Sequence, residues 1–185
     1  MEIKLAIDKI QKDSIVDGEG IRSVIWTQGC RHNCLGCHNP ETHTFHKGIN
    51  VDVELLKEKI SKLEGQDGVT FSGGDPMEQP EACAELSKHC KKVGLNVWCY
   101  TGYTFEELLE KAKINPAIID FLNNIDVLVD GKFILSEKSY DVVFRGSKNQ
   151  RLIDVPNSLK NNKTIEIDKY NNTYKKETKK TYLYV

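Results

Sequence analysis

The sequence predicts an α/β fold in which parallel strands form one sheet and helices cover it. Apolar runs rich in β-branched residues alternate with segments of helical periodicity for most of the 185 residues. Such repeated strand–helix units favour parallel pairing, because each helix carries the chain back to the start of the next strand. The length suits a single domain with its own core. The pattern alone fits both an open sheet and a partial barrel.

The first elements are recognised from residue type and spacing. A strand is expected at 22–27 (RSVIWT), which is rich in β-branched and aromatic residues. Apolar residues at helical spacing predict a helix over 52–63. A short strand at 69–71 then leads into the turn 72–76 (SGGDP).

The alternation continues in the second half. A helix is expected at 80–93, with a proline in its first turn and Gly94 at its carboxyl-terminal cap. A strand at 95–100 (LNVWCY) follows, and a capping-box pattern opens a helix at 104–113. A short helix at 116–123 and a strand at 126–129 (DVLV) complete the pattern.

The composition changes after about residue 157. We expect residues 1–157 to form the domain, and residues 158–185 to be a polar, Asn- and Lys-rich extension that is partly flexible. The extension holds one candidate strand, at 164–167.

Charge and hydropathy exclude several classes of protein. The formal net charge is −1, which gives no electrostatic footprint for nucleic acid. No apolar run approaches membrane-spanning length, and the first residues have no signal-peptide pattern. We therefore expect a cytoplasmic protein, in which closely spaced cysteines indicate metal binding or catalysis rather than disulfides.

Cys30, Cys34 and Cys37 form a C-x3-C-x2-C motif directly after the strand at 22–27. Three soft thiolates in one loop suit an iron–sulfur cluster or zinc. Three cysteines on a four-iron cluster would leave one iron open, and the amine and carboxylate of S-adenosylmethionine could chelate it. The alternative is a Cys3His zinc site completed by one of four nearby histidines: His32, His38, His43 or His46.

The other cysteines fit a core role. Cys83 and Cys90 share one stripe of the expected helix 80–93, and Cys99 lies in a strand. Free cysteine behaves as a small buried hydrophobe, so we expect all three to be structural. Trp26 and Trp98 are likewise expected in the core.

Further candidate ligand groups follow the expected strands. The turn Ser72-Gly73-Gly74-Asp75-Pro76 lies where parallel α/β folds bind ligands, and Asp75 could hold an ammonium group. Asp130 and Lys132 follow the strand 126–129 and should lie on the same rim. Asp130 could accept from ribose hydroxyls, and Lys132 or Arg145 could meet a carboxylate.

Several blocks in order resemble the radical S-adenosylmethionine activating enzymes of anaerobic (class III) ribonucleoside-triphosphate reductase. The likeness covers about 15–155. Its first three blocks are VDGEGIR at 16–22, the cysteine motif with the HNP that follows it at 30–40, and SGGDP at 72–76. These blocks are shared with activases of glycyl-radical enzymes in general. The blocks TGYT at 101–104 and FRGSKNQR at 144–151 resemble the reductase activase in particular.

The resemblance implies an incomplete (β/α) barrel that cleaves S-adenosylmethionine reductively at a [4Fe–4S] cluster. It implies that Cys30, Cys34 and Cys37 bind the cluster. Backbone around Gly36, Cys37 and His38 would contact adenine, the turn at Ser72, Gly73, Gly74 and Asp75 would hold the methionyl amine, and Asp130 and Lys132 would contact the cosubstrate. Asp75 stands where the wider superfamily usually has glutamate. Gly36 replaces an aromatic residue that is common elsewhere.

The implied partners are the catalytic subunit of the reductase, as protein substrate, and a flavodoxin-type electron donor. Two other functions stay open at this stage. One is activation of a different glycyl-radical enzyme, such as pyruvate formate-lyase. The other is a zinc-stabilised binding module without catalysis.

Overall fold

One sheet of eight strands carries helices at its surface in the computed structural model, which describes residues 1–7 and 10–171. The strands are β1 (Glu2–Leu5), β2 (Gln11–Ser14), β3 (Arg22–Thr27), β4 (Ile49–Asp52), β5 (Gly68–Gly73), β6 (Asn96–Tyr100), β7 (Val127–Asp130) and β8 (Arg151–Asp154). The helices are α1 (Val53–Ser61), α2 (Pro80–Lys92), α3 (Phe105–Ala112), α4 (Ala117–Leu122), α5 (Val155–Asn161) and α6 (Asp168–Asn171). Short 3-10 turns are η1 (Pro40–Thr42), η2 (Pro76–Glu78) and η3 (Leu135–Glu137).

The predicted α/β class is confirmed. Strands β3, β5, β6 and β7 pair in parallel at the centre of the sheet. The expected helices are present as α1 to α4, and Thr104 and Glu107 exchange both hydrogen bonds of the capping box. The strand order is β4-β1-β3-β5-β6-β7-β8, with β2 beside β3. Within the described residues the edge strands β4 and β8 do not pair with each other, so the (β/α) barrel is incomplete.

The edges of the sheet correct the expectation of purely parallel pairing. Strands β1, β2, β4 and β8 all pair antiparallel with their neighbours. Each is only four residues long, and β2 (QKDS) contains no apolar residue. Such short strands carry too few alternations for hydrophobic periodicity to reveal them.

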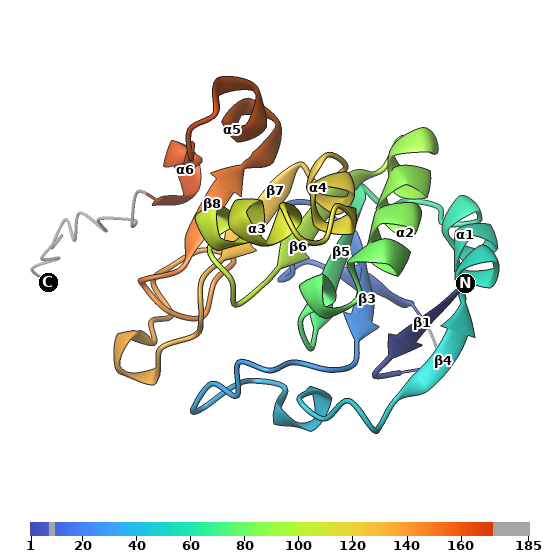
Figure 1. Cartoon of the computed structure of the whole chain (residues 1–185), viewed down its shortest axis with the longest axis horizontal. Helices are drawn as coiled ribbons and strands as arrows, with labels where there is room; N and C mark the ends of the chain where they lie inside the picture. Colours follow the sequence, from blue (N-terminus) through green and yellow to red (C-terminus); the bar gives the residue numbers. More distant parts are fainter. Residues whose placement is uncertain (8–9, 172–185) are drawn as a thin grey trace, which may run out of the picture.

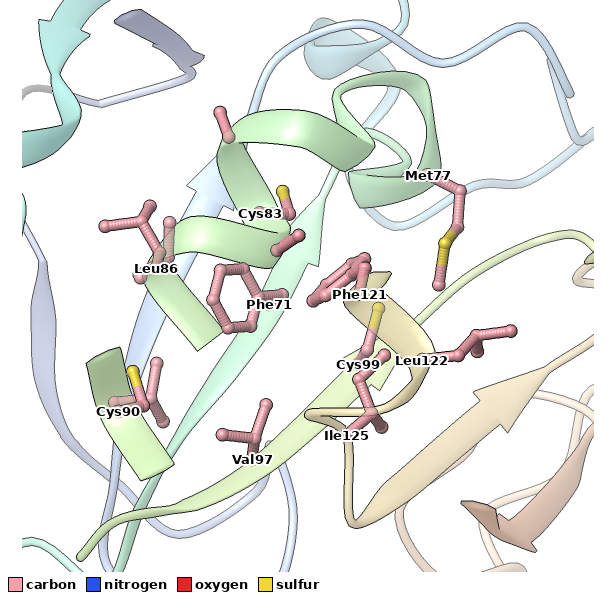
Figure 2. Close-up of a cluster of buried hydrophobic side chains, with 14 of the residues drawn as sticks. Phe71, Met77, Cys83, Leu86, Cys90, Val97, Cys99, Phe121, Leu122 and Ile125 are labelled. Carbon is pink, nitrogen blue, oxygen red and sulfur yellow. The ribbon is translucent and has the colours of Figure 1, made fainter. Parts of the chain in front are cut away.

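The two faces of the sheet are packed differently. Figure 1 shows α1 to α4 gathered along the sheet, and the main core lies between these helices and the strands. Phe71, Val97 and Cys99 face this core, whereas Trp98 belongs to a second cluster on the opposite face. In Figure 2 the rings of Phe71 and Phe121 meet, edge to face, with centroids 5.2 Å apart.

The three cysteines outside the motif lie in the core, as expected. Cys83, Cys90 and Cys99 are fully buried among apolar side chains (Figure 2). Burial raises the pKa of the Cys90 thiol to about 12. These thiols are therefore neutral packing groups.

The two tryptophans differ. Trp98 is 2% exposed and lies under the Arg22 guanidinium, 5.2 Å from the ring centroid. Trp26 is only half-buried, donates to the Gln11 side chain and lines the cavity described below. The core assignment of Trp26 is wrong because its face of β3 borders that cavity rather than the helices.

The described part of the polar extension packs onto the sheet. Helix α5 runs across residue 157, and the expected strand at 164–167 is reduced to one bridge between Ile153 and Glu166. Tyr170 in α6 is 7% exposed and meets the Trp98 ring. The boundary at 157 stays a prediction, and the expected flexible end falls on residues 172–185, outside the described part of the chain.

Asp130 joins three elements at the end of β7. Its fully buried carboxylate accepts from the Phe105 N–H at the start of α3, at 2.7 Å, and from two guanidinium nitrogens of Arg151 in β8. Arg151 also pairs with Glu106 in α3. Asp130 therefore supports the fold.

We predict that Asp130→Ala lowers the free energy of unfolding of the apoprotein by about 3–5 kcal/mol. The substitution removes the carboxylate that accepts from the half-buried Arg151 guanidinium and from the Phe105 amide. Urea unfolding measures this change. The exposed Asp120→Ala is the matched control and should shift stability by no more than about 0.5 kcal/mol. Equal effects of the two substitutions would contradict the assignment.

Candidate functional site

A cavity of about 610 Å³ opens at the carboxyl ends of the parallel strands. This is the edge at which parallel α/β folds bind ligands. Most of the residues expected from the sequence line it: Cys30, Cys34, Cys37, His38, Ser72, Gly73, Gly74 and Asp75. The structure thus brings the cysteine motif and the SGGDP turn to one site.

The cysteine loop leaves the end of β3 and returns beside its own start. The Gly29 N–H donates to the Thr42 carbonyl at 2.8 Å, and the Cys30 N–H to that of His43 at 3.0 Å. The loop is therefore closed at its base, where Cys30 lies, and Cys34 and Cys37 follow further along it.

A backbone amide contacts the motif at Cys37, where the N–H of Asn39 donates to the sulfur at 3.4 Å. Hydrogen bonds to sulfur stabilise thiolate charge and tune iron–sulfur clusters. The backbone of His32 acts to lower the pKa of Cys30, and the backbone of Phe133, after β7, acts to lower the pKa of Cys34.

Burial disfavours the charged form of two of these thiols. It raises the pKa of Cys30 to about 11 and also raises that of Cys34, where the amide of Phe133 and the charge of Lys132 oppose it. A bound metal would displace these protons, because the thiolate is the ligand.

Three thiolates on one loop suit a [4Fe–4S] cluster, because each cysteine of a cubane binds a different iron. A zinc ion would need four donors around one centre. Within the described residues, no three side chains from His, Cys, Asp or Glu form a group that could hold one metal ion. His32, a candidate fourth zinc ligand, pairs with Asp75.

The paired glycines of the SGGDP turn permit close backbone contact within the protein. Gly73 has φ +98°, and a Cβ there would lie 2.6 Å from the Thr27 carbonyl oxygen. A Cβ on Gly74 would lie 2.4 Å from the Gly29 carbonyl oxygen. The turn is also hydrogen-bonded to β3 and to the base of the cysteine loop, through Gly74 N–H to Thr27 and Asp75 N–H to Gly29.

The Asp75 side chain is engaged by the protein. The residue is 1% exposed, and its carboxylate accepts from the Thr101 hydroxyl, the amides of Met77 and Gly102, and the His32 ring. Asp75 thus links the turn after β5 to the turn after β6 and to the cysteine loop.

Three expected site residues are not part of the cavity wall. Asp130 is buried against Arg151, as described above. Lys132 is exposed, although its charge acts on Cys34. Gly36 has φ +75° and faces the Leu135 side chain, whose Cδ1 would be 2.9 Å from an added Cβ.

The FRGSKNQR block closes the far wall. Arg145 lines the cavity and donates to the carbonyls of Gln150 and Tyr170. The Gln150 amide oxygen accepts from the backbone of Gly146 and Ser147, and its nitrogen donates to the Gly131 carbonyl. This block folds the segment after β7 into a fixed loop.

Sequence reasoning missed the aromatic lining of the cavity. Trp26, Tyr100, Phe133 and Phe144 all border it. Each lies at or just after the end of a central strand, or in the FRGSKNQR block, and that position could have marked them. His38 and Phe133 form a ring pair with centroids 5.2 Å apart.

Comparisons with known proteins agree with this site. The family model described as "4Fe-4S single cluster domain" matches residues 16–153. The chain is 35% identical to the anaerobic ribonucleoside-triphosphate reductase-activating protein of Salmonella typhi, over 74% of this chain and 90% of that protein. The proteins of that name from Escherichia coli K12 and Enterobacteria phage T4 are 32% and 33% identical, over 74% and 78% of this chain and 90% and 91% of theirs.

Among solved structures, QueE from Escherichia coli matches with a TM-score of 0.44 and 18% identity, over 56% of this chain and 54% of that one. No helix in the described ranges is long and apolar enough to span a bilayer. By its similarity over most of its length, and with a 4Fe-4S single cluster domain matched over residues 16–153, the chain belongs to the anaerobic ribonucleoside-triphosphate reductase-activating family.

Proposed function

We propose that this chain is a radical S-adenosylmethionine activase that generates a glycyl radical on an anaerobic ribonucleoside-triphosphate reductase. The observation that carries the proposal is the meeting of Cys30, Cys34 and Cys37 with the SGGDP turn around one cavity. Its volume, about 610 Å³, lies within the range of small-molecule sites. The name of its relatives supplies the identity of the partner.

When bound and reduced, a [4Fe–4S] cluster would supply the one electron needed to break the sulfur–C5′ bond of S-adenosylmethionine. The products would be methionine and a 5′-deoxyadenosyl radical, which would take a hydrogen atom from a glycine of the reductase and become 5′-deoxyadenosine. The protein's part is placement and exclusion of water. Cys30, Cys34 and Cys37 would hold three irons and leave the fourth for the amino-acid end of the cosubstrate.

Groups in and beside the cavity suit the rest of the cosubstrate. The half-buried backbone of Ser72, Gly73 and Gly74, which lines the cavity, would receive the methionyl amine. The ring pair of His38 and Phe133 gives adenine an aromatic face beside the cysteine loop. Lys132, near Cys34, is a cation for a carboxylate or for the cluster's negative charge. Asp130 we assign to support of the fold.

A glycine in a partner protein can reach the radical only through the open mouth of the cavity, so the reductase must dock there. A flavodoxin-type electron donor is a proposal that rests on the family resemblance. It is compatible with a cysteine loop at the molecular surface, where Leu35 is 79% exposed. The cytoplasmic location stays an expectation from the sequence pattern.

The first prediction concerns the cluster. Anaerobic reconstitution with iron and sulfide should load about four irons and four sulfides per chain. Cys34→Ala should lose more than half of the iron, because only two protein ligands remain. The control Cys90→Ala removes a buried core thiol and should keep the wild-type iron content. A zinc-loaded, iron-free protein would contradict the proposal.

The second prediction concerns the reaction. Loaded protein with dithionite and S-adenosylmethionine should form 5′-deoxyadenosine, and addition of the reductase should raise a glycyl-radical signal in electron paramagnetic resonance. Cys37→Ala should abolish both signals. Fully loaded wild-type protein that yields no 5′-deoxyadenosine would falsify the proposed function.

A further inference from the structure

The acceptor capacity of Asp75 is used within the protein. An ionised carboxylate has about four lone-pair sites. Four donors reach this one: Met77 N–H at 3.0 Å, Thr101 hydroxyl at 2.9 Å, Gly102 N–H at 3.0 Å and His32 Nε2–H at 2.8 Å. A ligand ammonium could reach the carboxylate only by displacing one of these donors from a residue that is 1% exposed.

His32 brings the cysteine loop to this carboxylate. It lies between Cys30 and Cys34, and its side chain is 5% exposed. The ring packs edge-on against Tyr103, with centroids 4.4 Å apart. On its other side lies Gly102, where an added Cβ would be 2.4 Å from the ring. The ring is thus held in one place by packing as well as by the hydrogen bond.

A second contact between the cysteine loop and a buried carboxylate lies next to the pair of His32 and Asp75. Arg31 forms a bidentate pair with Glu78, whose side chain is 4% exposed, and the Tyr103 hydroxyl donates to Glu78 at 2.8 Å. Two adjacent residues of the cysteine loop are therefore anchored to the segment 75–78 through buried carboxylates. Tyr103 touches both anchors.

We propose that His32 and Asp75 are positioning residues, which fix the cluster loop against the SGGDP turn, and that the Asp75 carboxylate does not bind the cosubstrate amine. The methionyl amine then meets only the backbone of the turn, at a distance from the open iron that the His32–Asp75 pair sets. This inference rests on the proposed function, because it assigns the supports of the same site.

The length of the side chain at residue 75 agrees with this role. The Asp75 carboxylate accepts from the amide two residues later and so caps η2, a contact that a short side chain makes best. A glutamate is longer by one methylene. It could not keep this bond together with those to Thr101 and Gly102. A carboxylate that served only to bind an amine would have no such restriction.

The first test is His32→Ala in the reconstituted protein, with the exposed His46→Ala as control. The three cysteines and the amide of residue 32 remain, so iron and sulfide content should equal the wild type. S-adenosylmethionine should bind about 10- to 100-fold more weakly. Its binding should also change the resonance spectrum of the reduced cluster less than in the wild type. Unchanged affinity, or loss of the cluster, would overturn the proposal.

Gly102→Ala tests the position of the ring without removing a hydrogen-bonding side chain. The methyl group would push the His32 ring away from Asp75, so this variant should weaken cosubstrate binding as His32→Ala does. In the His32→Ala background the methyl group has room, and the second change should add little. Additive losses in the double variant would show that Gly102 acts independently and would overturn the coupling.

The variant Asp75→Glu distinguishes a carboxylate that supports the cysteine loop from one that binds the amine of S-adenosylmethionine directly. If the carboxylate supports the loop, glutamate should lower the affinity for S-adenosylmethionine by a factor similar to that of His32→Ala. Wild-type or tighter binding by Asp75→Glu would mean that the carboxylate contacts the amine. Wild-type protein that loads a cluster but fails to bind S-adenosylmethionine would instead refute the proposed function, so the two failures are distinguishable.

Discussion

Close contact between backbones at the carboxyl ends of the central strands is the constraint on which the site depends. The turn after β5 lies against the end of β3 and the base of the cysteine loop, at distances that leave no room for a Cβ on Gly73 or Gly74. Two amide hydrogen bonds fix this contact. The cysteine loop is long and contains only the short 3-10 turn η1 as regular structure, so its position relative to the SGGDP turn depends on this backbone contact. Any displacement there would move three thiols at once.

Buried carboxylates also stabilise the loops at the carboxyl ends of the central strands. Asp75, Glu78 and Asp130 each accept hydrogen bonds from two or more structural elements and are almost inaccessible to solvent. A buried carboxylate is stable when its lone pairs are filled, and it is strongly destabilising when they are not. These three acidic residues therefore hold the loops together. The cavity itself is lined by backbone, thiols, aromatic and imidazole rings, and by the charged side chains of Asp17 and Arg145.

The sequence predicts the central strands, the helices α1 to α4 and the cysteine motif because each rests on local information, whereas the short helices α5 and α6 were not predicted. Helical spacing, a capping box at Thr104 and a C-x3-C-x2-C motif are visible within a dozen residues. The antiparallel edge strands are too short for such signals. The roles of Asp75 and Asp130 could not be predicted for a different reason. From the sequence alone, a carboxylate after a strand could contact a ligand or support the fold. The structural role becomes visible only through partners far along the chain: Thr101, 26 residues from Asp75, and Arg151, 21 residues from Asp130. The aromatic lining depends likewise on where the strands end.

The far wall of the cavity is supported by a segment that lies beyond the part of the chain that the family model matches. That match ends at residue 153, yet Arg145 in the wall donates to the carbonyl of Tyr170. The rings of Tyr170, Trp98 and Phe144 make three edge-to-face contacts with one another, on the face of the sheet opposite the main core. Phe144 borders the cavity, and its carbonyl accepts from the Tyr100 hydroxyl. A segment outside the matched region thus holds a residue that lines the site. The lining residues all fall within the matched range 16–153, but in this chain the shape of the cavity also depends on α6.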